Sequence, residues 1–139
     1  MTADVRHLAR HQIMGLAAQF LLGMAVNLLG PPSQARGAAH TATTVFLAAH
    51  VLITLGLLAG AIMIIRATAP PRNPSRQLAI WGAIAIAATT AAGILTMITK
   101  SNWWSYTMAL GFIASLLVYG GLLLQARTPS QHSDRRPEN

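Results

Sequence analysis

The side chain best placed to do chemistry is His50, because it lies inside a long apolar run of the sequence. A histidine titrates near neutral pH and can carry a proton or bind a metal, so a histidine in such a run is a candidate functional group. Thr54 follows one helical turn later, and Gln19 and Asn27 supply amides in an earlier apolar run. These four residues are the candidates for contact with a ligand or a proton. A structural interpretation stays open, in which a neutral imidazole bonded to Thr54, Asn27 or a backbone carbonyl joins two helices.

A haem at His50 is a further alternative. A b-type haem in a helical bundle usually takes two axial ligands, commonly His with His or Met. His40 precedes His50 by ten residues and lies about 80° away around a helix, so the two cannot hold one iron from one straight helix. A methionine, or His50 of a second copy, would have to complete the site, and the spacing selects neither. A haem-binding redox subunit that uses His50 is therefore kept as an alternative hypothesis, and we expect no cofactor.

Metal and catalytic motifs are otherwise missing. His7 and His11 have the i, i+4 spacing that can hold a metal, but they lack a third ligand, and Arg6 and Arg10 beside them repel cations. We therefore expect an interfacial helical turn here and no metal site. The chain has no Cys, and its three acidic residues lie far from the apolar runs: Asp4, Asp134 and Glu138. Without paired carboxylates, a Ser-His-Asp triad or a phosphate-binding glycine loop, we expect no enzyme and no catalytic residue.

The composition indicates a membrane protein. Of 139 residues, 53% are hydrophobic and 9% charged, whereas about a quarter of the residues of a soluble domain are charged. Four apolar runs have roughly the ~20 residues that cross a bilayer; they cover 13–29, 43–65, 78–99 and 104–124. The sequence predicts one all-α domain over 1–127, a polytopic four-transmembrane-helix bundle, followed by a disordered cytoplasmic tail at 128–139.

The basic residues predict the orientation. With both termini cytoplasmic, the inner segments carry eight basic residues: Arg6, Arg10, Arg66, Arg72, Arg76, Arg127, Arg135 and Arg136. The outer segments carry two, Arg36 and Lys100. This asymmetry satisfies the positive-inside rule. Aromatic anchors fit the same frame, with Trp81 near the inner interface and three at the outer one: Trp103, Trp104 and Tyr106. Because the charges sit at helix ends, no nucleic-acid partner is expected.

The first run has a competing interpretation as a cleaved signal peptide. Arg6 and Arg10 would form its basic region, and the small residues of Ser33-Gln34-Ala35 would form the cleavage site. Its apolar stretch exceeds the usual 7 to 15 residues of such a peptide. It also carries an ordered polar stripe that a discarded segment does not need. We therefore expect this helix to be retained.

Small residues recur on each predicted helix, and in lipid such residues mark faces where helices pack. On the first helix a glycine and an amide alternate at every fourth position: Gly15, Gln19, Gly23 and Asn27. The second contains the GxxxG pair Gly56 and Gly60, which fits packing within the bundle or a dimer. The fourth has the small pair Gly111 and Ser115. The third helix has mostly small side chains, with Gly82, Thr89 and Thr96 on one side, and this predicts a central position in the bundle. Ser75 is the candidate N-cap of this helix.

Two stretches carry a resemblance to known proteins. Phe46-Leu47-Ala48-Ala49-His50 and Ser101-Asn102-Trp103-Trp104-Ser105-Tyr106 resemble uncharacterised small four-helix integral membrane proteins of actinobacteria. The resemblance implies a four-helix fold in a bacterial plasma membrane and implies no activity.

With no reactive group available, we expect a non-catalytic accessory or interaction subunit. It would act through helix packing with a partner complex or a second copy in the lipid bilayer. The alternative is a small-molecule or ion transporter or channel, whose path would be lined by polar residues from three helices: Gln19, Asn27, His50, Thr54, Thr89 and Thr96.

Overall fold

The chain folds into four helices. A computed structural model describes residues 3–30, 33–68, 74–99 and 101–125. The helices are α1 (Ala3–Leu29), α2 (Ala38–Ala67), α3 (Pro74–Thr99) and α4 (Asn102–Gln125). Each is long and apolar enough to cross a membrane, so the predicted all-helical fold with four such helices is confirmed. The tail predicted to be disordered at 128–139 lies outside the described residues.

The helices extend beyond the apolar runs, most of all at the start of α1, which begins ten residues before its run. A search for apolar residues finds only the part of a helix that matches the bilayer interior. α1 ends before Gly30, whose φ of 80° is the left-handed conformation that follows many helices. α3 begins at Pro74, since proline suits the first turn. Ser75 therefore lies inside the helix, and its prediction as the N-cap is wrong; its hydroxyl donates to Gln125 Oε1 at 3.2 Å.

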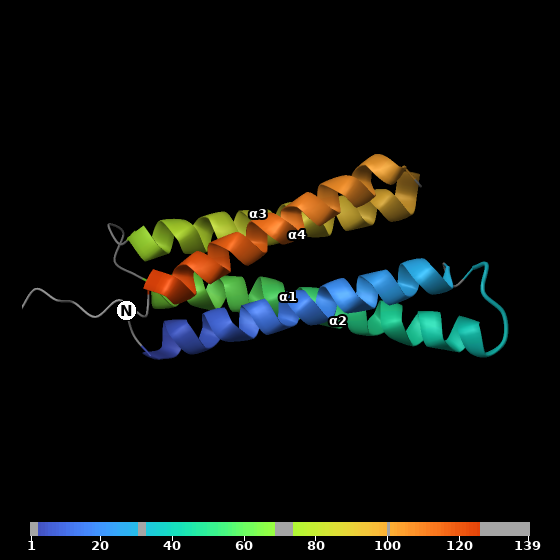
Figure 1. Cartoon of the computed structure of the whole chain (residues 1–139), viewed down its shortest axis with the longest axis horizontal. Coiled ribbons are helices and arrows are strands. Elements are labelled where there is room, and N and C mark those ends of the chain that lie inside the picture. The colour runs from blue at the N-terminus through green and yellow to red at the C-terminus, as the bar shows by residue number, and fades with distance from the viewer. Residues whose placement is uncertain (1–2, 31–32, 69–73, 100, 126–139) are drawn as a thin grey trace, which may run out of the picture.

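The four helices form a ring of two antiparallel hairpins (Figure 1). α1 packs most extensively on α2, and α3 on α4, while the α1–α4 and α2–α3 contacts are smaller. Within the described residues α1 does not contact α3, and α2 does not contact α4. The predicted central position of the third helix is wrong, because α3 borders only two neighbours. One side of α3 is indeed buried, at Ala79, Gly82 and Ile86, but its Ala87 and Ala88 are exposed.

The core is concentrated at one end of the ring, which we call the closed end. There α1 and α3 begin and α2 and α4 finish. The buried cluster draws on all four helices: Val5, Ala9, Leu16, Leu57, Ala61, Ile64, Ala79, Ile86, Tyr119 and Leu122. Burying such side chains against one another fixes the hairpins together at this end.

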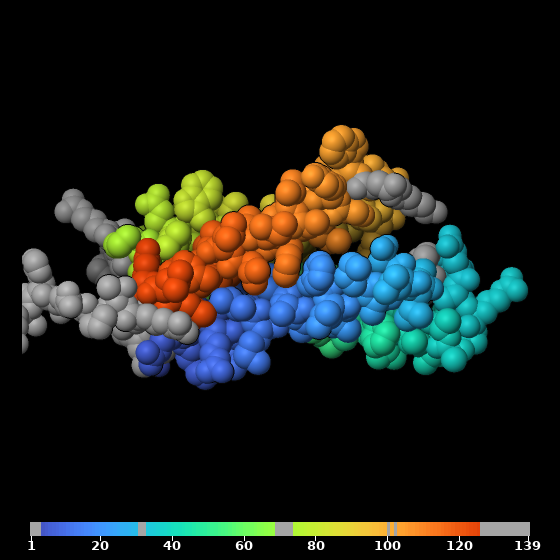
Figure 2. Space-filling view, in the orientation of Figure 1, coloured from blue at the N-terminus to red at the C-terminus, as the bar shows by residue number. Residues whose placement is uncertain are grey.

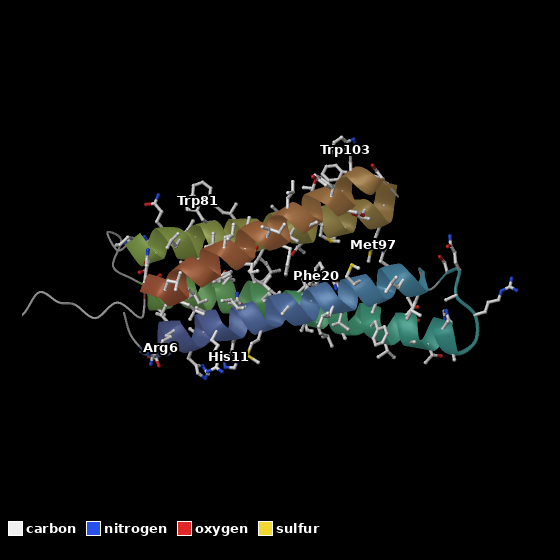
Figure 3. The ribbon with its side chains drawn as sticks, viewed as in Figure 1. Arg6, His11, Phe20, Trp81, Met97 and Trp103 are labelled. Carbon is white, nitrogen blue, oxygen red and sulfur yellow. The ribbon has the colours of Figure 1, made fainter. Side chains whose placement is uncertain are left out.

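At the opposite, open end the hairpins separate, as the space-filling view shows (Figure 2). In this half, Thr43 and Ala92 are the only buried residues that the structure describes. Phe20 of α1 stacks on Phe112 of α4, with ring centroids 5.0 Å apart, near the middle of the bundle. Closer to the open end than this pair, the Met97 side chain is 62% exposed. Figure 3 shows Phe20 and Met97 between the two hairpins.

Threonine hydroxyls in the helices bond to their own backbone. Thr89 donates to the Ala85 carbonyl at 2.7 Å, and Thr96 to Ala92 at 2.9 Å. The same i to i−4 bond occurs in every helix except α1, among the residues described. It satisfies a hydroxyl without a neighbouring helix. The hydroxyl hydrogens of Thr89 and Thr96, named in the transporter hypothesis, are therefore already donated, and their oxygens remain available only as acceptors.

Candidate functional site

Three of the four residues predicted to contact a ligand gather in the seam between α1 and α2: Gln19, His50 and Thr54. One face of α1 meets α2 in antiparallel register. A Cβ built at Gly15 would lie 2.9 Å from Leu57 Cδ2, and one at Gly23 would lie 3.4 Å from Cε1 of His50. Between these contacts, Gln19 bonds Thr54. The four-residue recurrence thus faces α2 over three successive turns, with His50 closest to the open end.

The polar groups of the seam form a short chain of hydrogen bonds. Gln19 Nε2 donates to Thr54 Oγ1, and Thr54 Oγ1 donates to the His50 carbonyl at 2.9 Å. The His50 ring lies within reach of the Gln19 backbone. The Thr54 hydroxyl thus links the Gln19 side chain of α1 to the backbone of α2. It is the kind of interhelical bond that favours association in lipid.

Two buried atoms of this seam have no hydrogen-bond partner among the described residues: Gln19 Oε1 and His50 Nδ1. Oε1 is an acceptor, and Nδ1 donates or accepts depending on the tautomer. Buried polar atoms are normally satisfied by protein or by ordered water. A water molecule or a small polar group would be needed to satisfy each of these atoms.

The other polar candidates lie apart from this pair. Asn27 is exposed, one turn beyond the last Gly contact. His7 and His11 are exposed, with their Nε2 atoms 3.2 Å apart. In the described part of the chain, no group of three His, Cys, Asp or Glu side chains is arranged to hold a metal.

The small residues predicted for packing fall into two groups. Gly60 faces α1, where a Cβ would lie 2.8 Å from Gln12 Oε1, and Gly111 faces Thr89 on α3. Ser115, one turn after Gly111, is buried and donates to the Gly111 carbonyl at 2.8 Å. Gly56, in contrast, is exposed, and a Cβ there would meet nothing within 4 Å. The two glycines of the GxxxG pair thus have different surroundings: Gly60 lies against α1, and Gly56 lies on the exposed surface.

The aromatic residues predicted as interface anchors lie toward opposite ends of the α3–α4 hairpin. Trp81 is 56% exposed near the closed end and Trp103 is 76% exposed at the open end; both point away from the bundle in Figure 3. Tyr106 is exposed and meets Trp103 edge to face at 6.3 Å, while Trp104 is half-buried.

The sequence reasoning missed a junction at the closed end, built by Gln12 and Tyr119. Gln12 Nε2 donates to the Leu57 carbonyl at 2.8 Å, and its amide lies against Gly60. Tyr119 is fully buried with its ring against Gly82. Its hydroxyl neighbours Gln12 but makes no well-formed hydrogen bond with the described residues. Gln12 lies seven residues before Gln19, on the same stripe, and that spacing was the available signal.

Comparisons of the chain with protein-family models, with curated proteins and with solved structures found no match.

Proposed function

We propose that this chain is a multi-pass protein of the bacterial plasma membrane that acts without catalysis, as an accessory or interaction subunit. Its helices would pack against a partner membrane protein or a second copy. Four helices long and apolar enough to cross a membrane support the insertion. The closed end would face the cytoplasm, because four of its described side chains are arginines: Arg6, Arg10, Arg66 and Arg76. The open end has Arg36 in the described part.

One observation carries the proposal: the outward face of α2 holds an exposed glycine, Gly56, that no neighbouring helix covers. Six helical glycines meet a side chain of a neighbouring helix within 4 Å, whereas Gly56 on α2 and Gly120 and Gly121 on α4 meet none. Ala48 and Ala59 are exposed within about 80° of Gly56 around α2, and the larger exposed side chains of Leu52 and Met63 lie between them on that side. In lipid an exposed glycine lets another helix approach closely, and the exposed apolar side chains beside it can pack on that helix. This is the surface that we assign to a partner helix.

The test replaces Gly56 without disturbing the bundle. Gly56→Leu adds a side chain into open space, so the helical content and thermal unfolding of the detergent-purified protein should stay unchanged. Association should fall, measured as self-association by energy transfer in liposomes and as partner recovery by quantitative affinity purification. Ala87→Leu, on the exposed side of α3, is the matched control and should leave both readouts intact. Unchanged association in Gly56→Leu would contradict the proposal.

A second candidate, transport of a small polar solute or an ion, is favoured by the unpartnered pair Gln19 Oε1 and His50 Nδ1. On that hypothesis His50→Ala, reconstituted in liposomes, loses flux while remaining folded. A haem-bound redox subunit would instead show a Soret band in the purified protein, and His50→Ala would remove it. An interaction subunit shows neither effect.

A further inference from the structure

The outer surface of α3 carries a small hollow at the closed end, separate from the α1–α2 seam. Its volume is about 180 Å³, and its walls come from one helix: Arg76, Gln77, Ile80, Trp81 and Ile84. Along the helix the polar side chains, a guanidinium and an amide, come first, and Ile80, Trp81 and Ile84 follow them. Arg76 and Ile84 are separated by about 12 Å along the axis.

Arg76 is poised for an anion. Its Nε is buried and has no hydrogen-bond partner among the described residues. The Arg76 side chain as a whole is half-buried, so a phosphate would bind its terminal N–H groups, as a guanidinium commonly does. Arg76 and Gln77 also lie in the first turn of α3, where free backbone N–H groups favour negative charge.

The surrounding charge fits the same ligand. The described part of the chain holds one acidic residue, Asp4. It lies on α1, which does not contact α3. Trp81 flanks the hollow and is 56% exposed, as is typical of tryptophan at the level of lipid headgroups. Ile80, just before Trp81, and Ile84, one turn after Ile80, are also exposed, and they offer an apolar surface in the direction of the bilayer interior.

From this juxtaposition we propose that the hollow binds an anionic phospholipid of the leaflet at the closed end. Arg76 and Gln77 take the phosphate, and Ile80 and Ile84 take the start of an acyl chain. The site rests on the membrane insertion proposed above, but not on association with a partner. The polar-to-apolar order matches an amphiphile lying along α3, whereas a free phosphate would leave the isoleucines without a role.

Trp81 supplies the probe. The chain has three tryptophans, so Trp103→Phe with Trp104→Phe leaves Trp81 alone. This variant is reconstituted in phosphatidylcholine liposomes that contain a small fraction of brominated lipid, either phosphatidylglycerol or phosphatidylcholine. We expect brominated phosphatidylglycerol to quench Trp81 more strongly. Arg76→Gln should weaken that preference about fivefold, the worth of one basic residue at an anionic surface. Arg10→Gln, at the same end on α1, should preserve it.

Three outcomes would overturn the assignment. Equal quenching by the two brominated lipids would show no preference for the anionic headgroup. An equal loss in Arg10→Gln would assign the preference to diffuse charge. Relief of quenching by millimolar inorganic phosphate would assign the hollow to free phosphate. If neither brominated lipid quenched Trp81, membrane insertion itself would be refuted. If the lipid preference were intact but association were unchanged in Gly56→Leu, only the interaction-subunit proposal would be refuted.

Discussion

Gln12 of α1 occupies the space beside Gly60 of α2: a Cβ at Gly60 would lie 2.8 Å from Gln12 Oε1 and 3.1 Å from its Cδ. The same Gln12 side chain donates to the Leu57 carbonyl. The close approach of α1 and α2 and the hydrogen bond that joins them therefore depend on one missing side chain.

The two glycines of the GxxxG pair should respond in opposite ways to alanine. Gly60→Ala forces the Gln12 amide to move and weakens its bond to Leu57, so we expect a loss of about 1–3 kcal/mol in the free energy of unfolding. Gly56→Ala meets no atom, and alanine is the better helix former by about 1 kcal/mol. It should be neutral or stabilising. Unfolding in detergent measures both, and equal effects would contradict the asymmetric environment of the pair.

The contact between Tyr119 and Gly82 makes a second prediction. A Cβ at Gly82 would lie 2.8 Å from Tyr119 Cζ, and the ring is fully buried. Overpacking of this kind costs typically about 1–3 kcal/mol, so Gly82→Ala should lower the unfolding temperature. Gly121→Ala on α4, where nothing lies within 4 Å, is the control. The double variant Gly82→Ala with Tyr119→Leu should recover part of the lost unfolding temperature. No recovery would show that a clash with the Tyr119 ring does not cause the loss.

The hydrogen bond between Gln19 and Thr54 can be measured by a double-mutant cycle. Gln19→Leu and Thr54→Val each remove one partner, and together they remove the bond without leaving an orphan. In membrane proteins such bonds couple by about 0.6 kcal/mol on average and about 1.7 at most. We expect a coupling energy in the upper part of that range, because the bond is part-buried. A coupling energy near zero would show that the two side chains stabilise the contact by packing and not by their hydrogen bond.

The separation of the hairpins predicts unequal distance distributions at the two ends. Because the chain has no cysteine, spin labels can be placed through introduced cysteines alone. Leu28 and Ile98 are exposed at the open end, and Arg10 and Gln77 are exposed at the closed end. Pulsed electron paramagnetic resonance should give a broad distribution of label-to-label distances for the first pair and a narrow one for the second. Two equally narrow distributions would show that the hairpins are held together along their whole length.

Much of the fold was predictable because apolar length is a direct requirement of crossing a bilayer. The recurrence of Gly15, Gln19 and Gly23 likewise followed from helical periodicity. Which helix they would meet did not follow, since small residues permit a contact without choosing its partner. Gln12 was missed because it lies before the apolar run, in the polar first half of a longer helix. The central position expected for the third helix failed for a related reason: in a ring of four, no helix is central, and small residues on α3 face outward as well.

The uneven core divides the molecule into parts of different local stability. Tyr119, Leu122 and their neighbours join all four helices at the closed end, so amide hydrogens there exchange with solvent deuterium only when the whole bundle opens. Beyond the stacked rings of Phe20 and Phe112, each hairpin depends mainly on its own two helices. That half can loosen in small, frequent fluctuations while the other half keeps the fold intact.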